Sequence, residues 1–187
     1  MNIIFCHGVM GPDEDWNNKT YNESKSWKDW LQFTTEAEHD VLMQIPRFPH
    51  AHALHMKYDE WEKIMNTQDI NTDTTLIGHS AGGGFILKYM ATHPDLHIRQ
   101  IVLVAPWIDT DDFQPFGFYK NFDLNNDLIS RTKLGIDMMV SKDDMPHIIS
   151  STEKIIKNMP GINVHRFSGY GHFILPKLPE IMPIIKF

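Results

Sequence analysis

The chain alternates from end to end between short apolar runs and segments with helical spacing. The apolar runs have the length and β-branched content of buried strands, and turn-forming or polar residues separate them from the helical segments. Alternation roughly every 20–30 residues is typical of βαβ crossovers, which predict an α/β fold with a mostly parallel sheet and helices on both faces. The expected strands are 3–7, 41–45, 74–78, 101–105, 137–141 and 162–167, and the expected helices are 26–36, 58–66, 85–92 and 147–158.

Length and composition favour one folded domain over residues 1–187. A chain of 187 residues has the size of a single domain, and a 42% hydrophobic share can fill its core. Lys and Arg total 17 and Asp and Glu total 24, and the resulting charge of −7 disfavours binding to nucleic acid or an anionic membrane surface. The sequence makes no prediction about oligomeric state.

Cysteine usage and hydropathy bear on the compartment. The single cysteine, Cys6, excludes an intramolecular disulfide framework and any CxxC zinc site. No apolar run approaches the roughly 20 residues that span a bilayer, and the first residues lack the pattern of a secretory signal. We therefore expect a soluble, cytoplasmic protein with no membrane partner.

Residues 78–82, with the sequence GHSAG, match the G-x-S-x-G pattern. An expected strand precedes them and an expected helix follows, which is the context that a nucleophile elbow requires. Small residues two positions to either side allow a sharp turn that presents the Ser80 hydroxyl at the helix N-terminus, where the Ala81 amide can face a developing oxyanion. The alternatives are a tightly packed turn or a phosphate-binding turn, but the motifs of the latter are missing. The pattern predicts Ser80 as a nucleophile.

A nucleophilic serine needs a histidine base and an acid that orients it, which follow the elbow in the order acid, then histidine. His172 lies in a glycine-containing loop after the last expected strand and is the predicted base. Asp143 and Asp144 both follow the preceding strand, and the residues alone leave the choice open, although adjacent acids point in different directions.

A second oxyanion donor is expected from the loop after the first strand, at residues 7–11. The backbone N–H of Val9 is the preferred candidate, paired with that of Ala81. The His7 side chain is expected to brace this loop by hydrogen bonding rather than to take part in the chemistry.

Together, these motifs resemble the compact serine hydrolases related to retinoblastoma-binding protein nine, over nearly the whole chain. The resemblance implies a minimal α/β-hydrolase fold and cleavage of small esters or related acyl compounds. It also implies that the second acid of the pair, Asp144, completes the triad with Ser80 and His172. The retinoblastoma-binding L-x-C-x-E motif is absent. The motifs that carry the resemblance are His-Gly at 7–8, GHSAG at 78–82, SKDD at 141–144 and GHF at 171–173.

His50, His52 and His55 lie close together in the sequence, as metal ligands can. Without matching carboxylates or cysteines, a surface loop is the better interpretation, and no metal is predicted.

Residues 106–134 are rich in aromatic residues and lack a clean period. We expect them to form a short lid-like insertion that lines or covers the site, with ordinary core as the alternative. The acids at its start, Asp109, Asp111 and Asp112, would disfavour anionic acyl groups if they faced the pocket.

The sequence thus predicts a carboxylesterase-like serine hydrolase that forms an acyl-enzyme, with a small acyl compound and water as substrates and no cofactor. It does not separate esters from thioesters, amides or lactones. The alternative is a non-catalytic binding module that kept the α/β-hydrolase fold. The presence of all three triad groups in order argues against that alternative.

Overall fold

The computed structural model describes residues 1–8, 26–49, 56–108, 118–119, 123–125 and 127–187. Every expected strand and helix is present within this part of the chain. The strands are β1 Asn2–Cys6, β2 Leu42–Gln44, β3 Thr74–His79, β4 Gln100–Val104, β5 Ile136–Ser141 and β6 Asn163–Phe167. The helices are α1 Trp27–His39, α2 Tyr58–Met65, α3 Ala81–Thr92, α4 Asp127–Ser130 and α5 Pro146–Asn158, with a 3-10 turn, η2, at Pro179–Ile181.

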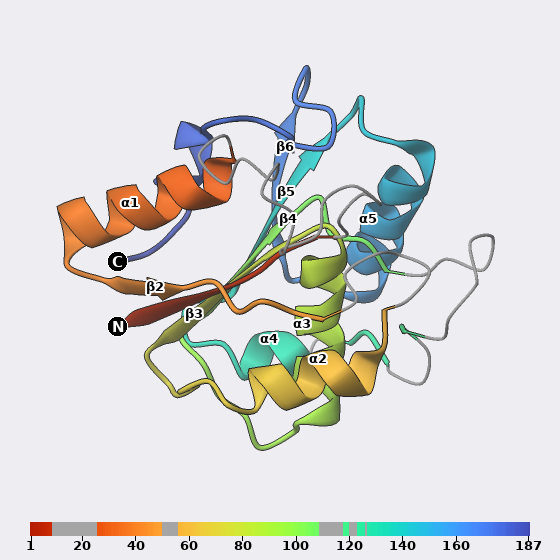
Figure 1. The fold of residues 1–187 in the computed structure, drawn as a ribbon. Coiled ribbons are helices and arrows are strands. Elements are labelled where there is room, and N and C mark those ends of the chain that lie inside the picture. The colour runs from red at the N-terminus through yellow and green to blue at the C-terminus, as the bar shows by residue number, and fades with distance from the viewer. Residues whose placement is uncertain (9–25, 50–55, 109–117, 120–122, 126) are drawn as a thin grey trace.

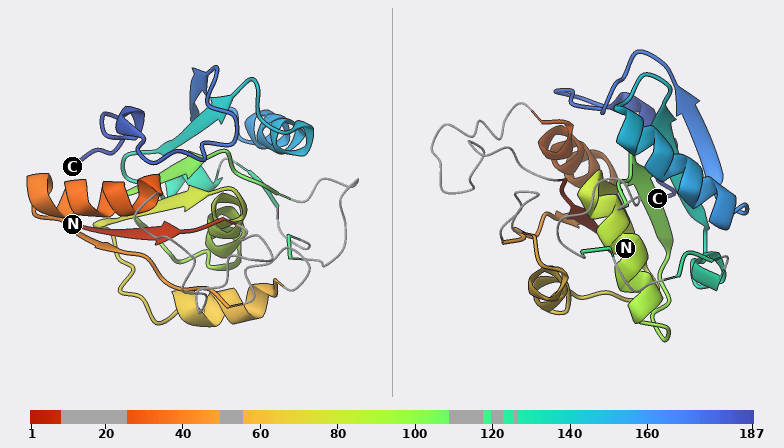
Figure 2. Two further views of the ribbon diagram at one scale, coloured as in Figure 1. Left: turned by 45° about the horizontal axis from the view of Figure 1, so that its top comes forward. Right: turned by 90° about the vertical axis from the view of Figure 1, so that its right-hand side faces the viewer.

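The described strands form one parallel sheet in the order β2-β1-β3-β4-β5-β6 (Figure 1). The chain moves from β1 outward to β2, returns to β3 and then proceeds to the other edge. Because βαβ crossovers are right-handed, a helix that leads to a strand on one side lies on the opposite face of the sheet from a helix that leads to a strand on the other side. Accordingly, α1 lies with the C-terminal segment on one side of the sheet and α2, α3 and α5 lie on the other (Figures 1 and 2). The predicted α/β architecture is confirmed.

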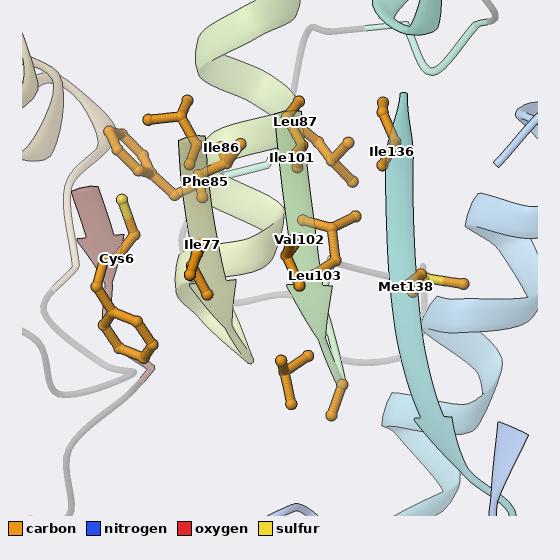
Figure 3. Close-up of a cluster of buried hydrophobic side chains, with 14 of the residues drawn as sticks. Cys6, Ile77, Phe85, Ile86, Leu87, Ile101, Val102, Leu103, Ile136 and Met138 are labelled. Carbon is orange, nitrogen blue, oxygen red and sulfur yellow. The ribbon is translucent and has the colours of Figure 1, made fainter. Parts of the chain in front are cut away.

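The core lies at the middle of this sheet. Both β4 and nearly all of β3 are buried along their length, as expected for central parallel strands covered on both faces. Side chains of these strands and of α3, such as Ile77, Val102, Leu103, Phe85 and Leu87, gather in one cluster (Figure 3). Packing between the sheet and α3 therefore fixes the positions of the strand ends.

A buried polar network holds the C-terminal segment against the N-terminal ends of β4 and β5. Asp137 on β5 accepts hydrogen bonds from Gln100 Nε2 at 2.8 Å and forms an ion pair with Lys186 Nζ at 3.5 Å. Gln100 also donates to the carbonyl of Ile184 and accepts from the Lys186 amide. Prolines at 176, 179 and 183 interrupt helical hydrogen bonding here, and the segment contains only the short η2 turn.

Helix α3 begins at Ala81, four residues before the expected start at residue 85. The glycines at 82–84 have low helix propensity, which is why the sequence pattern placed the boundary after them. Their helical conformation is required by close contacts instead. A Cβ on Gly82 would overlap the carbonyl groups of Cys6 and His7, and one on Gly78 would lie 2.6 Å from the Cα of Gly83. Glycine at 82 therefore allows α3 to pack against the end of β1, and glycine at 78 allows β3 to approach the first turn of α3.

Gly82→Ala should destabilise the protein, although alanine is the better helix former by ~1 kcal/mol. The added Cβ would press on backbone carbonyls that cannot move without shifting β1. We expect the free energy of unfolding to fall by about 2 kcal/mol or more, measured by urea denaturation. The control is Ala91→Gly in the same helix, which loses helix propensity and one partly buried methyl group but creates no overlap, and should cost about 1–2 kcal/mol. Equal or raised stability of Gly82→Ala would contradict the close contact.

Candidate active site

Ser80 occupies the sharp turn between β3 and α3. Its backbone has φ 53° and ψ −122°, a conformation that a non-glycine residue adopts only under constraint, at a cost of about 1–3 kcal/mol. The Ser80 amide donates to the Val104 carbonyl at 3.0 Å, and the Ser80 carbonyl accepts from the amides of Gly83 and Trp107 at 3.0 and 2.9 Å. These bonds fix the turn against the end of β4. The geometry is that of a nucleophile elbow.

The predicted oxyanion donors lie around this turn. Ala81 is the first residue of α3, so its amide belongs to the helix N-terminal turn, whose N–H groups have no acceptor within the helix. Gly8, which follows β1, approaches the serine so closely that a Cβ there would come within 2.9 Å of the Ser80 Cβ. The loop after β1 therefore starts beside Ser80. Val9 itself lies outside the described residues.

Asp144 and His172 form a hydrogen-bonded pair. The His172 Nδ1 lies 3.0 and 3.1 Å from the two carboxylate oxygens of Asp144, which also accepts from the Met145 amide at 2.7 Å. The side chain of Asp144 is only 2% exposed and that of His172 is 12% exposed. A buried carboxylate at this position holds the imidazole with its proton on Nδ1, which leaves Nε2 free to accept a proton.

Asp143 has a different role from its neighbour. Its exposed carboxylate accepts hydrogen bonds from the Ser141 hydroxyl at 2.5 Å and from the amides of Gly169 and Gly171 at 2.8 and 3.2 Å. These hydrogen bonds to the charged form lower the pKa of Asp143. Of the two acids, Asp144 contacts His172 and Asp143 holds the loop that carries this histidine. The sequence did not predict these loop contacts of Asp143.

Two neutral histidines support the strand ends. His7 is buried, donates from Nδ1 to the Gly8 carbonyl at 2.8 Å and accepts at Nε2 from the Phe48 amide at 3.2 Å, so its expected bracing role is confirmed. His79 lies 2.9 Å from the His172 carbonyl through Nε2. Burial lowers the pKa of each of these histidines to about 4. The contact of His79 was missed in the sequence, where residue 79 is the variable position of the elbow motif.

The structure brings His172 to the elbow through His79, whose ring centroid lies 4.9 Å from that of His172. Within the described part of the chain, no hydrogen bond joins the Ser80 hydroxyl to His172. Catalytic hydrogen bonds in ligand-free proteins are often long and tighten only when substrate binds. The Asp144–His172 pair is thus formed, and His79, the residue before Ser80, contacts His172.

Only part of the lid-like insertion expected at 106–134 is described. Tyr119 donates its hydroxyl to the Ala81 carbonyl at 2.9 Å, and Lys88 of α3 donates to the Phe118 carbonyl at 2.7 Å. These bonds attach the insertion to the first and second turns of α3, directly behind the elbow. The sequence did not predict either contact, nor the short helix α4 within this segment. The acids at 109, 111 and 112 lie outside the described residues.

The described residues also bear on metal binding and on membrane insertion. Within the described ranges, no three His, Cys, Asp or Glu side chains are grouped to hold a metal ion. The three histidines at 50, 52 and 55 lie outside those ranges. None of the helices that the structure describes is long and apolar enough to cross a membrane.

Comparison with known proteins agrees with this geometry. Residues 62–138, which include the elbow, match the sequence family described as the alpha/beta hydrolase fold. The chain has the α/β-hydrolase fold. The comparison with curated proteins gave no match.

Solved structures with this fold superpose on most of the chain. The ydeN gene product of Bacillus subtilis has a TM-score of 0.75 at 19% identity, covering 98% of this chain and 95% of that protein. Est1E of Butyrivibrio proteoclasticus, solved with ferulic acid, has a TM-score of 0.59 at 14% identity, with 91% and 80% covered. The naproxen esterase of B. subtilis has a TM-score of 0.60 at 9% identity, with 96% and 79% covered. The finer resemblance to hydrolases related to retinoblastoma-binding protein nine stays a prediction.

The neutral histidines predict a loss of stability in mild acid. His7, which faces Lys28, and His79, which faces His172 and Asp144, have pKa values of about 4 in the folded protein, against about 6.5 in an unfolded chain. Between pH 6.5 and 4 the unfolded state binds protons that the folded state does not. The free energy of unfolding should therefore fall as the pH is lowered, by up to ~1.4 kcal/mol per pH unit for each histidine.

Urea unfolding at pH 8, 7, 6 and 5 measures this slope. In His79→Gln the slope between pH 6 and 5 should be shallower by about 1 kcal/mol per pH unit, because one titrating group is gone. Between pH 8 and 7 the two proteins should have the same slope. Identical slopes at all pH values would show that His79 is not held neutral by the fold.

Proposed function

We propose that the protein is a serine hydrolase that cleaves small carboxylic esters through an acyl-enzyme. The observation that carries the proposal is the strained backbone of Ser80 in a strand-to-helix turn, joined through His79 to a buried Asp144–His172 pair. A serine in this conformation costs stability, and that cost is accounted for if the turn presents the hydroxyl to a substrate. The α/β-hydrolase fold supplies the same arrangement of elbow, acid and base that this chemistry uses.

In the proposed reaction, the Ser80 hydroxyl attacks the acyl carbonyl while His172 Nε2 accepts its proton. His172 then donates that proton to the leaving alcohol, and an ester of Ser80 remains. Water, activated by the same histidine, hydrolyses this acyl-enzyme and restores the serine. Asp144 holds the imidazole in the required tautomer and stabilises the imidazolium. No cofactor takes part.

The oxyanion formed in each step needs two hydrogen-bond donors. We assign one to the Ala81 amide at the start of α3 and the other to the Val9 amide. Support for the second assignment comes from Gly8, which places the start of that loop against Ser80. Tyr119, bonded to the Ala81 carbonyl, supports the same peptide segment from behind.

Esters are the preferred substrate class because the structural neighbours include a protein solved with ferulic acid and a naproxen esterase. A cytoplasmic location is part of the proposal. Its support is that Cys6 is buried and unpaired, with a thiol pKa raised by that burial, as is usual for a protein of a reducing compartment.

A fluorophosphonate probe tests the nucleophile. The native protein should be labelled and should hydrolyse p-nitrophenyl esters, whereas Ser80→Ala should lose labelling and at least ~10³-fold of kcat, because no other group forms the acyl-enzyme. Ser130→Ala, at an exposed serine of α4, is the matched control and should be labelled normally. If the native protein shows neither labelling nor turnover, the non-catalytic binding module becomes the better account.

Asparagine substitutions separate the two acids. Asp144→Asn should lower kcat by roughly 10³- to 10⁴-fold, since the amide favours the wrong imidazole tautomer. Asp143→Asn keeps one carbonyl acceptor for the loop amides and should lower kcat by no more than about 10-fold. Turnover of p-nitrophenyl acetate measures both. A larger loss in Asp143→Asn than in Asp144→Asn would reverse the assignment.

A further inference from the structure

The side chain of His79 connects the nucleophile to the base. The residue precedes Ser80 directly, at the end of β3, and its Nε2 lies 2.9 Å from the backbone carbonyl of His172. A carbonyl oxygen only accepts, so Nε2 must carry the proton of this hydrogen bond. His79 is therefore the chain neighbour of Ser80, and its side chain is hydrogen-bonded to the backbone of the predicted base, His172.

Further segments approach the partly buried His79 ring. Trp27, the first residue of α1, meets it edge-on with ring centroids 5.8 Å apart. The Trp27 amide in turn donates to the Leu175 carbonyl at 2.9 Å, three residues beyond His172. A Cβ on Gly8 would lie 3.5 Å from His79 Nδ1. These contacts from β1, α1 and the base loop leave the ring little freedom to turn away from the His172 carbonyl.

The charge of His79 also suits this position. Burial, and then the nearby His172, lower its pKa, so the ring is neutral near neutral pH. A neutral ring with its proton on Nε2 still donates the hydrogen bond. When His172 becomes an imidazolium during the proposed reaction, a neutral neighbour does not oppose it, whereas a lysine or arginine in the same place would.

We propose that His79 is a positioning residue, which fixes the backbone of His172 relative to Ser80 by its Nε2–H donor. This inference rests on the proposed hydrolase function. Asp143 holds the same loop from the other end, through the amides of Gly169 and Gly171. Asp143 therefore fixes the loop segment that precedes His172, and His79 fixes the backbone of His172 relative to Ser80.

Two substitutions of similar size separate positioning from space filling. His79→Gln retains an N–H donor near the position of Nε2, whereas His79→Met fills the space without one. Because small displacements of a catalytic group cost about 10²-fold, we expect His79→Met to lower kcat for p-nitrophenyl acetate by roughly that factor with little change in KM. His79→Gln should keep kcat within about 5-fold of the native value. Equal losses in the two variants would overturn the proposal.

Nuclear magnetic resonance gives a readout that does not depend on turnover. The proton between His172 Nδ1 and Asp144 should give a downfield signal that persists in His79→Gln and shifts or broadens in His79→Met. An unchanged signal in His79→Met would overturn positioning, even if the protein hydrolyses esters. Absence of fluorophosphonate labelling in the native protein would instead overturn the proposed function, and the two failures are thereby distinct.

The native protein provides a third test should a variant fail to fold. The nitrogen chemical shifts of the His79 ring report its tautomer directly. The proposal requires the proton on Nε2 and a lone pair on Nδ1. A proton on Nδ1 alone would leave the His172 carbonyl without its donor, and the proposal would be wrong.

Discussion

The backbone of Ser80 is the constraint on which the rest of the structure depends. Its amide and carbonyl bond to residues at and beyond the end of β4, while its side chain meets the start of the loop after β1. A positive φ costs a serine conformational free energy, and the contacts around the turn outweigh that cost. The glycines on either side allow the same close packing, because a Cβ on Gly82 would overlap the end of β1 and a Cβ on Gly78 would overlap the backbone of α3.

Buried polar groups around this turn are held by hydrogen bonds in a definite protonation state. His7 and His79 are neutral because burial disfavours the imidazolium, and each uses its ring to bind backbone groups of a neighbouring loop. Asp144 is buried yet retains three hydrogen-bond contacts, from His172 and the Met145 amide. Such groups rigidify a site when every partner is present and destabilise it when one is lost. The predicted fall in stability in mild acid and the proposed role of His79 both follow from this property.

Local sequence patterns predicted the strands and most helix positions well, because periodicity and β-branched content report burial directly. They failed where long-range contact overrides propensity. The glycine-rich start of α3 is helical because β1 packs against it, and the four-residue helix α4 is too short to show a period. The aromatic segment around it is attached to α3 by Lys88 and Tyr119, whose partners lie about 30 to 40 positions away in the chain.

The sequence by itself determined the α/β architecture, the elbow at Ser80 and the candidates for its partners, because these depend on residue type, spacing and order along the chain. Only the tertiary structure decided which acid contacts His172 and which loop groups Asp143 and His79 bind. Adjacent aspartates look alike in a sequence, and the direction of each side chain depends on where the loop at 168–172 returns to the sheet. That return depends on long-range hydrogen bonds from loop amides and the His172 ring to the two carboxylates, which no local pattern encodes.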